Sequence, residues 1–172
     1  MTIQMKSDLV RTRLWIAAVC LLLSSCYSFT GASLPPHIKT IAVPLADDIS
    51  GFGQADVRQR ITELLTDKFT QDGSLQVTNR SRADAIVEAT IRSITDENVG
   101  VQQGEQLTTK RVTIFVDVVY RDQKKQKDFW QQSFNAKGEY PIEQMQTGLR
   151  NALATAEEQL AEDILLKVIS NW

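Results

Sequence analysis

Cys26 is the residue of this chain with the clearest capacity for chemistry. A thiolate is a strong nucleophile that can accept a transferred lipid group, and the two serines before it are small enough for the peptide to enter a signal peptidase. The thiol closes an apolar run, residues 14–26, that is preceded by the cations Lys6, Arg11 and Arg13. A positive leader, an apolar run of about ten residues and a small-residue exit predict a secretory signal peptide. The run is too short to cross a bilayer, which takes roughly 20 apolar residues.

The four residues from Leu23 to Cys26 resemble the lipobox of bacterial lipoproteins. This resemblance implies a thioether-linked diacylglycerol on Cys26, cleavage before it and acylation of the new amino terminus, with no other cofactor. Three acyl chains, at about 0.8 kcal/mol per buried methylene, would make the anchor permanent. Tyr27 rather than aspartate follows the cysteine, which by the usual sorting pattern favours the outer membrane. The alternative is an ordinary signal peptide with an incidental cysteine.

These motifs divide the chain into three parts. We expect residues 1–25 to be a removed signal peptide, residues 26–37 a lipidated tether containing Pro35 and Pro36, and residues 38–172 a single domain. The mature chain would keep 16 basic and 20 acidic side chains, because three cations and Asp8 leave with the signal peptide. This negative balance gives no support for nucleic-acid binding. Cys20 leaves too, so no cysteine remains for a disulfide, a metal or a redox role.

Other residue patterns that could support catalysis are weak. The single histidine, His37, is expected to be a surface residue of the tether, and one histidine without a thiol excludes the familiar nucleophilic triads. Gly51 and Gly53 lack the third glycine of a dinucleotide fingerprint. The acidic pairs Asp47–Asp48 and Asp96–Glu97 are expected to be solvated carboxylates in loops rather than a glycosidic acid/base pair. The sequence therefore predicts a protein that is not an enzyme and holds no metal.

Two small groups of cations could meet the phosphates of an acidic glycolipid. Lys110 and Arg111 begin a predicted strand, and Lys124 and Lys125 lie in the turn beyond its other end. The alternative is that such lysines keep a turn soluble and protect a sheet edge. On the first interpretation, replacing Lys124 and Lys125 by glutamate weakens glycolipid binding without unfolding the domain.

The elements that must position these residues follow from the hydrophobic periodicity. Residues 39–45 predict a buried strand, residues 46–53 a loop, and apolar residues at helical spacing from Val57 to Phe69 a helix that ends at Gly73. A short strand is expected at residues 75–78. Strict alternation then predicts three strands, at residues 85–94, 111–121 and 129–137, with a glycine- and glutamine-containing loop at residues 98–107. After Pro141, apolar residues at steps of three and four continue to Val168 and predict a helix of roughly 40 Å.

These elements assemble most economically as an α+β two-layer sandwich. Two helices would pack on one face of a four- to five-stranded, mostly antiparallel mixed sheet. The alternation leaves the other face polar, with Phe115 and Val119 on it. That open face could take a partner.

Four segments carry a resemblance to a known family. The mature start (residues 27–33), the first strand (39–43), the segment 127–134 and the ending (164–172), in this order behind the lipobox, resemble the LptE-like family of lipopolysaccharide-assembly lipoproteins. The resemblance covers essentially the whole mature chain. It implies a lipoprotein of the outer membrane that faces the periplasm or sits as a plug inside a large β-barrel partner of the LptD type. It also implies binding of lipopolysaccharide for insertion into the outer leaflet, although the family's glycolipid-contacting residues do not match this sequence position by position.

The sequence is also compatible with two other functions. An outer-membrane lipoprotein of similar build could scaffold or regulate another envelope machine, such as a secretion pore or a peptidoglycan synthase. A periplasmic hydrolase with an unfamiliar site is the second. Purification from detergent-solubilised outer membranes would separate the three, because each predicts a different partner or a turnover activity.

Overall fold

The computed structural model describes residues 34–53, 56–99 and 109–170. All of them belong to one compact unit, Ala32–Trp172. The predicted signal peptide and Cys26 lie outside the described residues, as do residues 100–107 of the predicted loop, so those predictions remain untested. Neither helix in the described part of the chain has the length and apolarity needed to cross a bilayer.

The chain opens with the predicted strand-helix-strand unit. Strand β1 (Thr40–Ala42) and strand β3 (Gln76–Val77) pair in parallel, and helix α2 (Val57–Asp72) connects them. The apolar residues of α2 recur at every fourth position, so they share one face and are buried: Val57, Ile61, Leu65 and Phe69. The helix ends at Gly73, whose φ of 72° suits a residue without a Cβ and whose N–H donates to Phe69.

Three long antiparallel strands form the body of the sheet. They are β4 (Ala85–Val99), β5 (Thr109–Asp122) and β6 (Lys127–Pro141), and the order across the sheet is β3-β1-β4-β5-β6. Strand β2 (Asp47–Asp48) also pairs with β4, so the described residues form six strands rather than the four or five expected. The extra strand has only two residues, which is too short for any periodic signal in the sequence.

Strand β4 continues to Val99, beyond the predicted end at residue 94. A β-bulge changes the phase of its alternation, so the sequence pattern does not show the second half of the strand. Ile91 faces Val116 and Ser93 faces Phe115, so Arg92 between them has no cross-strand partner. Beyond the bulge the inward positions become Ile94 and Asp96, and the pattern that identified the strand no longer continues in register. The pair Asp96–Glu97, expected in a loop, is therefore part of the sheet.

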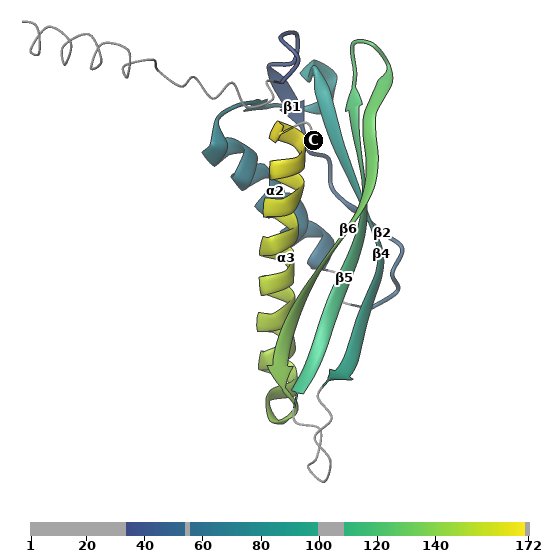
Figure 1. The fold of residues 1–172 in the computed structure, drawn as a ribbon, viewed down its shortest axis with the longest axis vertical. Helices are drawn as coiled ribbons and strands as arrows, with labels where there is room; N and C mark the ends of the chain where they lie inside the picture. Colours follow the sequence, from purple (N-terminus) through teal and green to yellow (C-terminus); the bar gives the residue numbers. More distant parts are fainter. Residues whose placement is uncertain (1–33, 54–55, 100–108, 171–172) are drawn as a thin grey trace, which may run out of the picture. The chain divides into compact units, whose positions relative to one another are not determined.

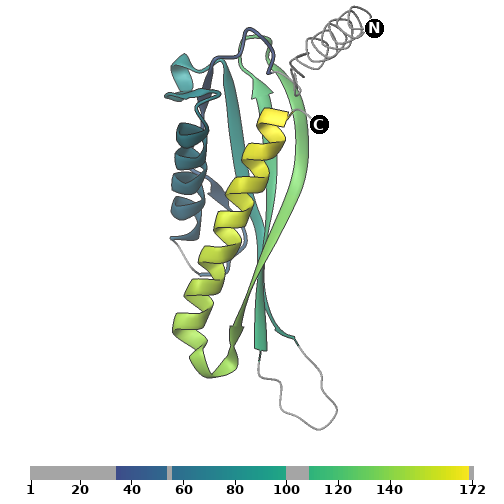
Figure 2. The ribbon, with the colours of Figure 1, turned by 60° about the vertical axis from the view of Figure 1, so that its left-hand side comes forward.

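Helix α3 (Met145–Ser170) follows β6 through the short 3-10 turn η2 (Ile142–Gln144). A second 3-10 turn, η1 (Arg80–Arg82), lies between β3 and β4. Figures 1 and 2 show α2 and α3 on the same side of the sheet, with α3 running back along β6. This confirms the predicted two-layer α+β sandwich with both helices on one face. The sheet's other face carries no helix among the described residues.

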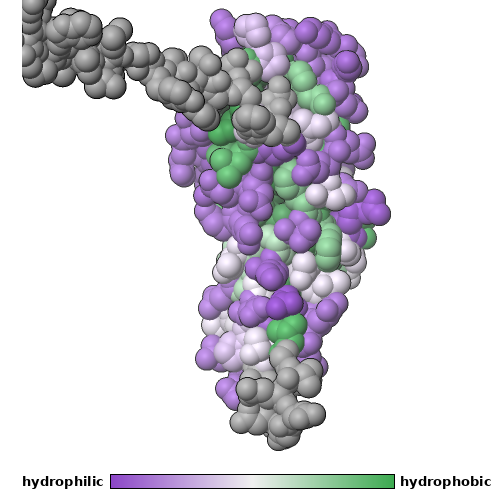
Figure 3. Space-filling model, viewed as in Figure 1, coloured by the Kyte–Doolittle hydropathy of each residue, from purple (hydrophilic) through white to green (hydrophobic). Residues whose placement is uncertain are grey.

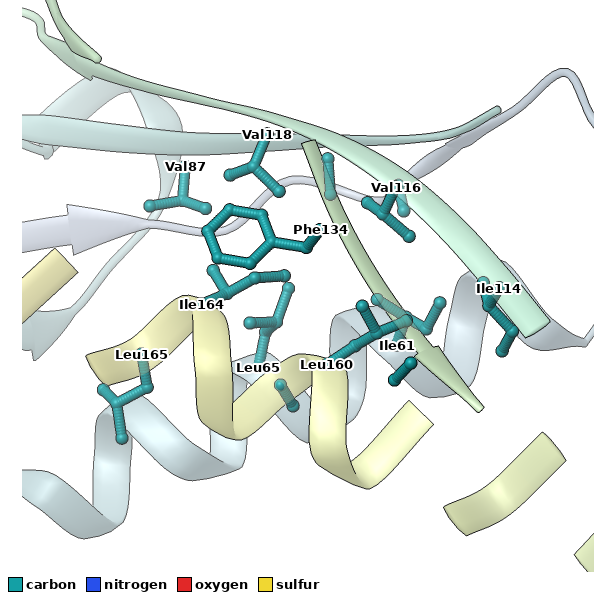
Figure 4. Close-up of a cluster of buried hydrophobic side chains, with 14 of the residues drawn as sticks. Ile61, Leu65, Val87, Ile114, Val116, Val118, Phe134, Leu160, Ile164 and Leu165 are labelled. Carbon is teal, nitrogen blue, oxygen red and sulfur yellow. The ribbon is translucent and has the colours of Figure 1, made fainter. Parts of the chain in front are cut away.

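The core lies between the helices and the sheet. Figure 4 shows the ring of Phe134 of β6 between Val87 of β4 and Val118 of β5 on one side and Ile164 of α3 on the other. The inward residues of β5 predicted from alternation are all buried: Val112, Ile114, Val116, Val118 and Tyr120. Every buried apolar residue of this core lies between Ile38 and Val168. The unit Ala32–Trp172 therefore has a complete core of its own and is expected to fold by itself.

One buried ion pair joins the two helices. Glu157 of α3 is fully buried and accepts two hydrogen bonds, each 2.8 Å long, from Nε and Nη2 of Arg60 in α2. Arg60 also pairs with Asp56, one turn earlier. The bond to Glu157 raises the pKa of Arg60, so the guanidinium stays charged. A cavity of about 630 Å³ opens beside this pair and is lined by Asp56, Arg60, Met145, Gln146, Leu149, Arg150 and Leu153.

Candidate functional site

The face of the sheet away from the helices is left uncovered by the described helices. Its centre is formed by the outward residues of β5, which alternate with the buried ones. Across the ladder, Phe115 lies between Ser93 and Asn135, and Val119 lies between Glu88 and Gln131. The face is therefore mostly polar and mostly uncharged along its middle, as the sequence predicted.

Several apolar side chains are exposed on this open face. Phe115 is 37% exposed, and the residues flanking β2, Leu45 and Ile49, are 53% and 66% exposed. Strand β2 runs parallel to β4 with Asp47 beside Thr90, so alternation places Leu45 and Ile49 on the same side as Phe115. Ala46, which lies between Leu45 and β2, is instead buried, and its N–H donates to the Thr62 hydroxyl of α2. We call Leu45, Ile49, Phe115 and Val119 the apolar row.

A small hydrogen-bonded network fixes the middle of the open face. Asp117 accepts a bond of 2.6 Å from Ser133 and an ion pair of 2.9 Å from Arg92, the residue at the bulge. The Ser133 bond, with a smaller contribution from Arg92, holds the pKa of Asp117 below its ordinary value. The network orders the polar side chains of the open face and leaves Phe115, Leu45 and Ile49 exposed.

The structure does not bring the four predicted cations together. Lys110 lies near the start of β5 and Lys124 lies beyond its end, so about 40 Å of strand, at 3.3 Å per residue, separates them. They form two candidate sites at opposite ends of the domain rather than one.

At the first end, Lys110 is committed to an internal network. Its ammonium lies 2.8 Å from Asp96, which also accepts the Tyr140 hydroxyl at 2.8 and 2.9 Å. The Asp96 bond raises the pKa of Lys110, while burial, reinforced by the bond to Asp96, raises the pKa of Tyr140. Arg111 points to the open face and donates to Glu139 from both Nε and Nη2, at 2.9 and 2.7 Å. That pair is exposed, and exposed ion pairs open at little cost.

At the second end, two carboxylates tie the start of the domain to the β5–β6 turn. Asp84 pairs with Lys124 at 2.6 Å and accepts the backbone amides of Lys39 and Thr40. Asp122, which is almost fully buried, pairs with His37 at 2.6 Å and accepts the amide of Lys125. Burial alone would raise the pKa of Asp122, but its hydrogen bonds from His37 and the turn amides hold it below the ordinary value.

This arrangement corrects one expectation and bears on a second. His37 is half-buried and paired, not a loose surface residue, because the chain turns back onto the buried Asp122. A glutamate at position 124 would face Asp84, so the double replacement of Lys124 and Lys125 would disturb the fold as well as the surface. Sequence patterns gave no signal for either contact, since the paired residues are about 40 and 85 positions apart.

We expect Asp84→Asn to destabilise the domain by about 1–3 kcal/mol at neutral pH, the range for hydrogen bonds to charged groups. Lys124, followed by the backbone amide of Lys39, lowers the pKa of Asp84 in the folded state. A lowered folded pKa means that the ionised form stabilises the fold, so this contribution is full above the unfolded pKa of about 3.9 and fades at more acidic pH. Urea unfolding at neutral pH and near pH 3 should therefore show a shrinking difference between the variant and the parent.

Asp67→Asn is the matched control, because Asp67 is exposed on α2 and makes no hydrogen bond or ion pair among the described residues. It should change stability little at either pH. An Asp84→Asn effect that stays constant between neutral and acidic pH would contradict the assigned role of its charge.

The described residues offer little for catalysis. None of their histidine, cysteine, aspartate and glutamate side chains form a group of three that could hold a metal ion. Asp47 is exposed, and Asp48 accepts the amide of Ser50 in a local turn. The cavity beside Arg60 contains guanidinium, carboxylate and apolar groups but no histidine, serine or thiol.

Comparison with known proteins agrees with this fold. A crystal structure of a Xanthomonas campestris protein matches with a TM-score of 0.61 and 12% identity, over 81% of this chain and 90% of that one. Lipoprotein B from Nitrosomonas europaea has a TM-score of 0.57 and 12% identity, over 81% and 86%. Rare lipoprotein B from Shewanella oneidensis has a TM-score of 0.52 and 9% identity, over 77% and 95%. At these identities the similarity shows the fold alone.

The family comparison is more specific. No curated protein matches the chain at a significant level. The family model for LptE, described as lipopolysaccharide-assembly, matches residues 38–168, which is most of the chain and the whole of the core described above. The chain therefore belongs to the LptE lipopolysaccharide-assembly family.

Proposed function

We propose that this protein is an acylated, non-catalytic lipopolysaccharide-assembly component of the outer membrane. Lipid on Cys26 would anchor it, and the open sheet face would dock against a large outer-membrane β-barrel protein of the LptD type. The observation that carries the proposal is the open face with its apolar row, in a chain of the LptE family. Two structural neighbours are themselves named lipoproteins, which supports the anchor.

The open face has the size and chemistry of a protein interface. Three strands about 4.8 Å apart and about 45 Å long give roughly 650 Å², close to the 800 Å² that each partner buries in a standard complex. Exposed Phe115 lies on the middle strand of this face among uncharged polar residues, and exposed Leu45 and Ile49 lie at its edge beside β4. This mix of apolar and uncharged polar groups suits a protein interface. The lumen of a large barrel is polar as well, so such a face can dock there without leaving charges unpaired.

The fold also suggests how the domain is oriented. Leu34, where the tether enters the domain, lies at the end that carries the β5–β6 turn, because His37 binds Asp122 there. The strands extend about 45 Å from that end, whereas the hydrocarbon core of a bilayer is about 30 Å thick. A domain anchored at the inner leaflet could therefore reach the level of the outer leaflet with its far end.

This orientation ranks the candidate glycolipid contacts. Lys110 and Arg111 lie at the far end, where lipopolysaccharide is inserted, and Arg111 is the more available because its pair with Glu139 is exposed. Lys124 and Lys125 lie at the opposite end, where the tether enters the domain beside the β5–β6 turn; we call it the anchored end. We propose that Arg111, together with the nearby Lys110, binds the phosphates of the glycolipid.

Docking of the open face is tested by Phe115→Glu. A charge placed in the middle of the apolar row should sharply reduce recovery of the barrel protein when the acylated full chain is purified from detergent-solubilised outer membranes. Leu166→Glu is the matched control, because Leu166 is an exposed apolar residue on α3. Equal recovery with both variants would reject this face as the interface. Recovery of a different envelope complex with the parent chain would support the scaffold alternative.

Glycolipid contact is tested separately with Arg111→Gln and Lys125→Gln. At low salt, where charge effects are least screened, Arg111→Gln should retain clearly less lipopolysaccharide in a pull-down, and Lys125→Gln should behave like the parent. The reverse result would place the glycolipid at the anchored end. No loss with either variant would reject both ends as phosphate sites.

A further inference from the structure

Three segments that are distant in the sequence converge at the anchored end of the domain. They are residues 34–40, residues 79–85 and the turn at residues 121–127. Asp84 holds the first and third through the amides of Lys39 and Thr40 and the ammonium of Lys124. Thr40 in turn accepts the Asp84 amide and donates to the carbonyl of Arg82. The convergence gathers cations that the sequence shows only as separate residues.

Four acidic residues in or beside these segments are already hydrogen-bonded or ion-paired. Asp84 pairs with Lys124, Asp122 with His37, Glu88 with Arg80, and Asp128 with Arg121, at 2.5 to 2.8 Å. Four further cations are exposed and have no acidic partner among the described residues: Lys39, Arg82, Lys125 and Lys127. We call these four the anchor-end basic surface. The surface carries a net positive charge although the whole chain is acidic by two charges.

We infer that the anchor-end basic surface binds the anionic phospholipid headgroups of the leaflet that holds the lipid anchor. The inference rests on the proposed acylation of Cys26. Cys26 lies eight residues before Leu34, so this part of the chain spans at most roughly 29 Å at up to about 3.6 Å per residue. The anchored end is therefore held close to the headgroups whatever the tether's path.

The chemistry of the surface fits a membrane better than a shaped ligand site. Three of its four cations are lysines, whose ammonium groups act as mobile point charges rather than as a bidentate cradle. Figure 3 shows mostly hydrophilic side chains at this end on the face in view, with a few hydrophobic ones among them. Binding should follow surface charge and fall with salt, with little preference among anionic headgroups. A basic patch beside an acyl chain is the usual second contact of a lipidated protein.

The test uses the unit Ala32–Trp172, which has a complete core and contains no anchor. It is mixed at low salt with vesicles of phosphatidylglycerol in phosphatidylcholine, or of phosphatidylcholine alone, and the bound fraction is measured by sedimentation. We expect binding to the phosphatidylglycerol vesicles only, and its loss at high salt. Lys39→Gln with Lys125→Gln should weaken binding about 25-fold, since each basic residue near an anionic surface contributes roughly fivefold.

The matched control is Lys137→Gln with Arg58→Gln. These two cations are exposed, have no ion pair among the described residues, and lie on β6 and α2 away from the anchored end. The control pair should bind like the parent. Absence of binding to phosphatidylglycerol, equal loss in both pairs, or binding to lipopolysaccharide aggregates alone would overturn the inference. Because the tested unit lacks Cys26, mass spectrometry of the full chain reports on the anchor separately, and barrel recovery reports on the proposed function.

Discussion

Replacing Gly138 by alanine is expected to lower the free energy of unfolding by about 3 kcal/mol or more, at the upper end of what overpacking costs. A Cβ at Gly138 would lie 2.6 Å from both the Cα and the carbonyl carbon of Ala152, and nearer still to its carbonyl oxygen. These are backbone atoms of α3, so no side-chain rotation relieves the clash and the helix must move away from β6. Thermal unfolding should show a Tm lower by roughly 10 °C, at about 3 °C per kcal/mol.

Gly73→Ala is the control for Gly138→Ala. Its Cβ would meet no atom within 4 Å, and only the left-handed φ of 72° is strained, which costs about 1–2 kcal/mol. The double variant Gly138→Ala with Ala152→Gly should not recover stability, because the clash involves the backbone of residue 152. A Gly138→Ala variant as stable as Gly73→Ala would contradict the close contact between β6 and α3.

Replacing Arg60 by alanine is expected to cost about 3 kcal/mol, because breaking a buried ion pair leaves the remaining charge without a partner. Glu157 is fully buried and receives both of its side-chain hydrogen bonds from Arg60. A second hollow, of about 300 Å³, is lined by both Arg60 and Glu157 and can admit water to Glu157 in the variant. This places the estimate at the lower end of the usual range of about 3–5 kcal/mol. Chemical denaturation followed by circular dichroism measures the loss.

Two further variants separate the buried charge from lost packing. Arg60→Met with Glu157→Leu removes both charges and should recover most of the stability, since well-packed apolar residues often replace a buried pair without loss. Lys68→Ala breaks exposed pairs between the same helices, with Glu158 and Glu162, and should change stability little. An Arg60→Ala variant no less stable than Lys68→Ala would mean that the buried pair does not hold the helices together.

The large elements of this fold could be predicted because each has a local periodic signal. Period two along β5 identified its five inward residues, and steps of three and four after Pro141 identified α3. Gly73 marked the end of α2 because a left-handed residue without a Cβ is a local requirement. Phe115 and Val119 were correctly assigned to the open face by the same alternation.

The parts that could not be predicted depend on contacts across the fold. Strand β2 is too short to show a period, and the bulge at Arg92 shifted the phase that would have extended β4. The pairing of Lys110 with Asp96, which also binds Tyr140, has no local signal because the three residues lie on different strands. His37 is expected from the sequence to be a surface residue of the tether, but its ring is hydrogen-bonded to the buried Asp122.

From the sequence alone came the signal-like leader with Cys26, the α+β sandwich with both helices on one face, and the resemblance to the LptE family. Tertiary structure alone decided which cations are neutralised, that Lys110 and Lys124 lie at opposite ends, and that a basic surface forms where the tether enters. The physical reason is range. Side-chain periodicity depends on residues that are close in the sequence, so it can be detected from the sequence alone. An ion pair or a charged surface between distant segments forms only when the fold brings those segments together.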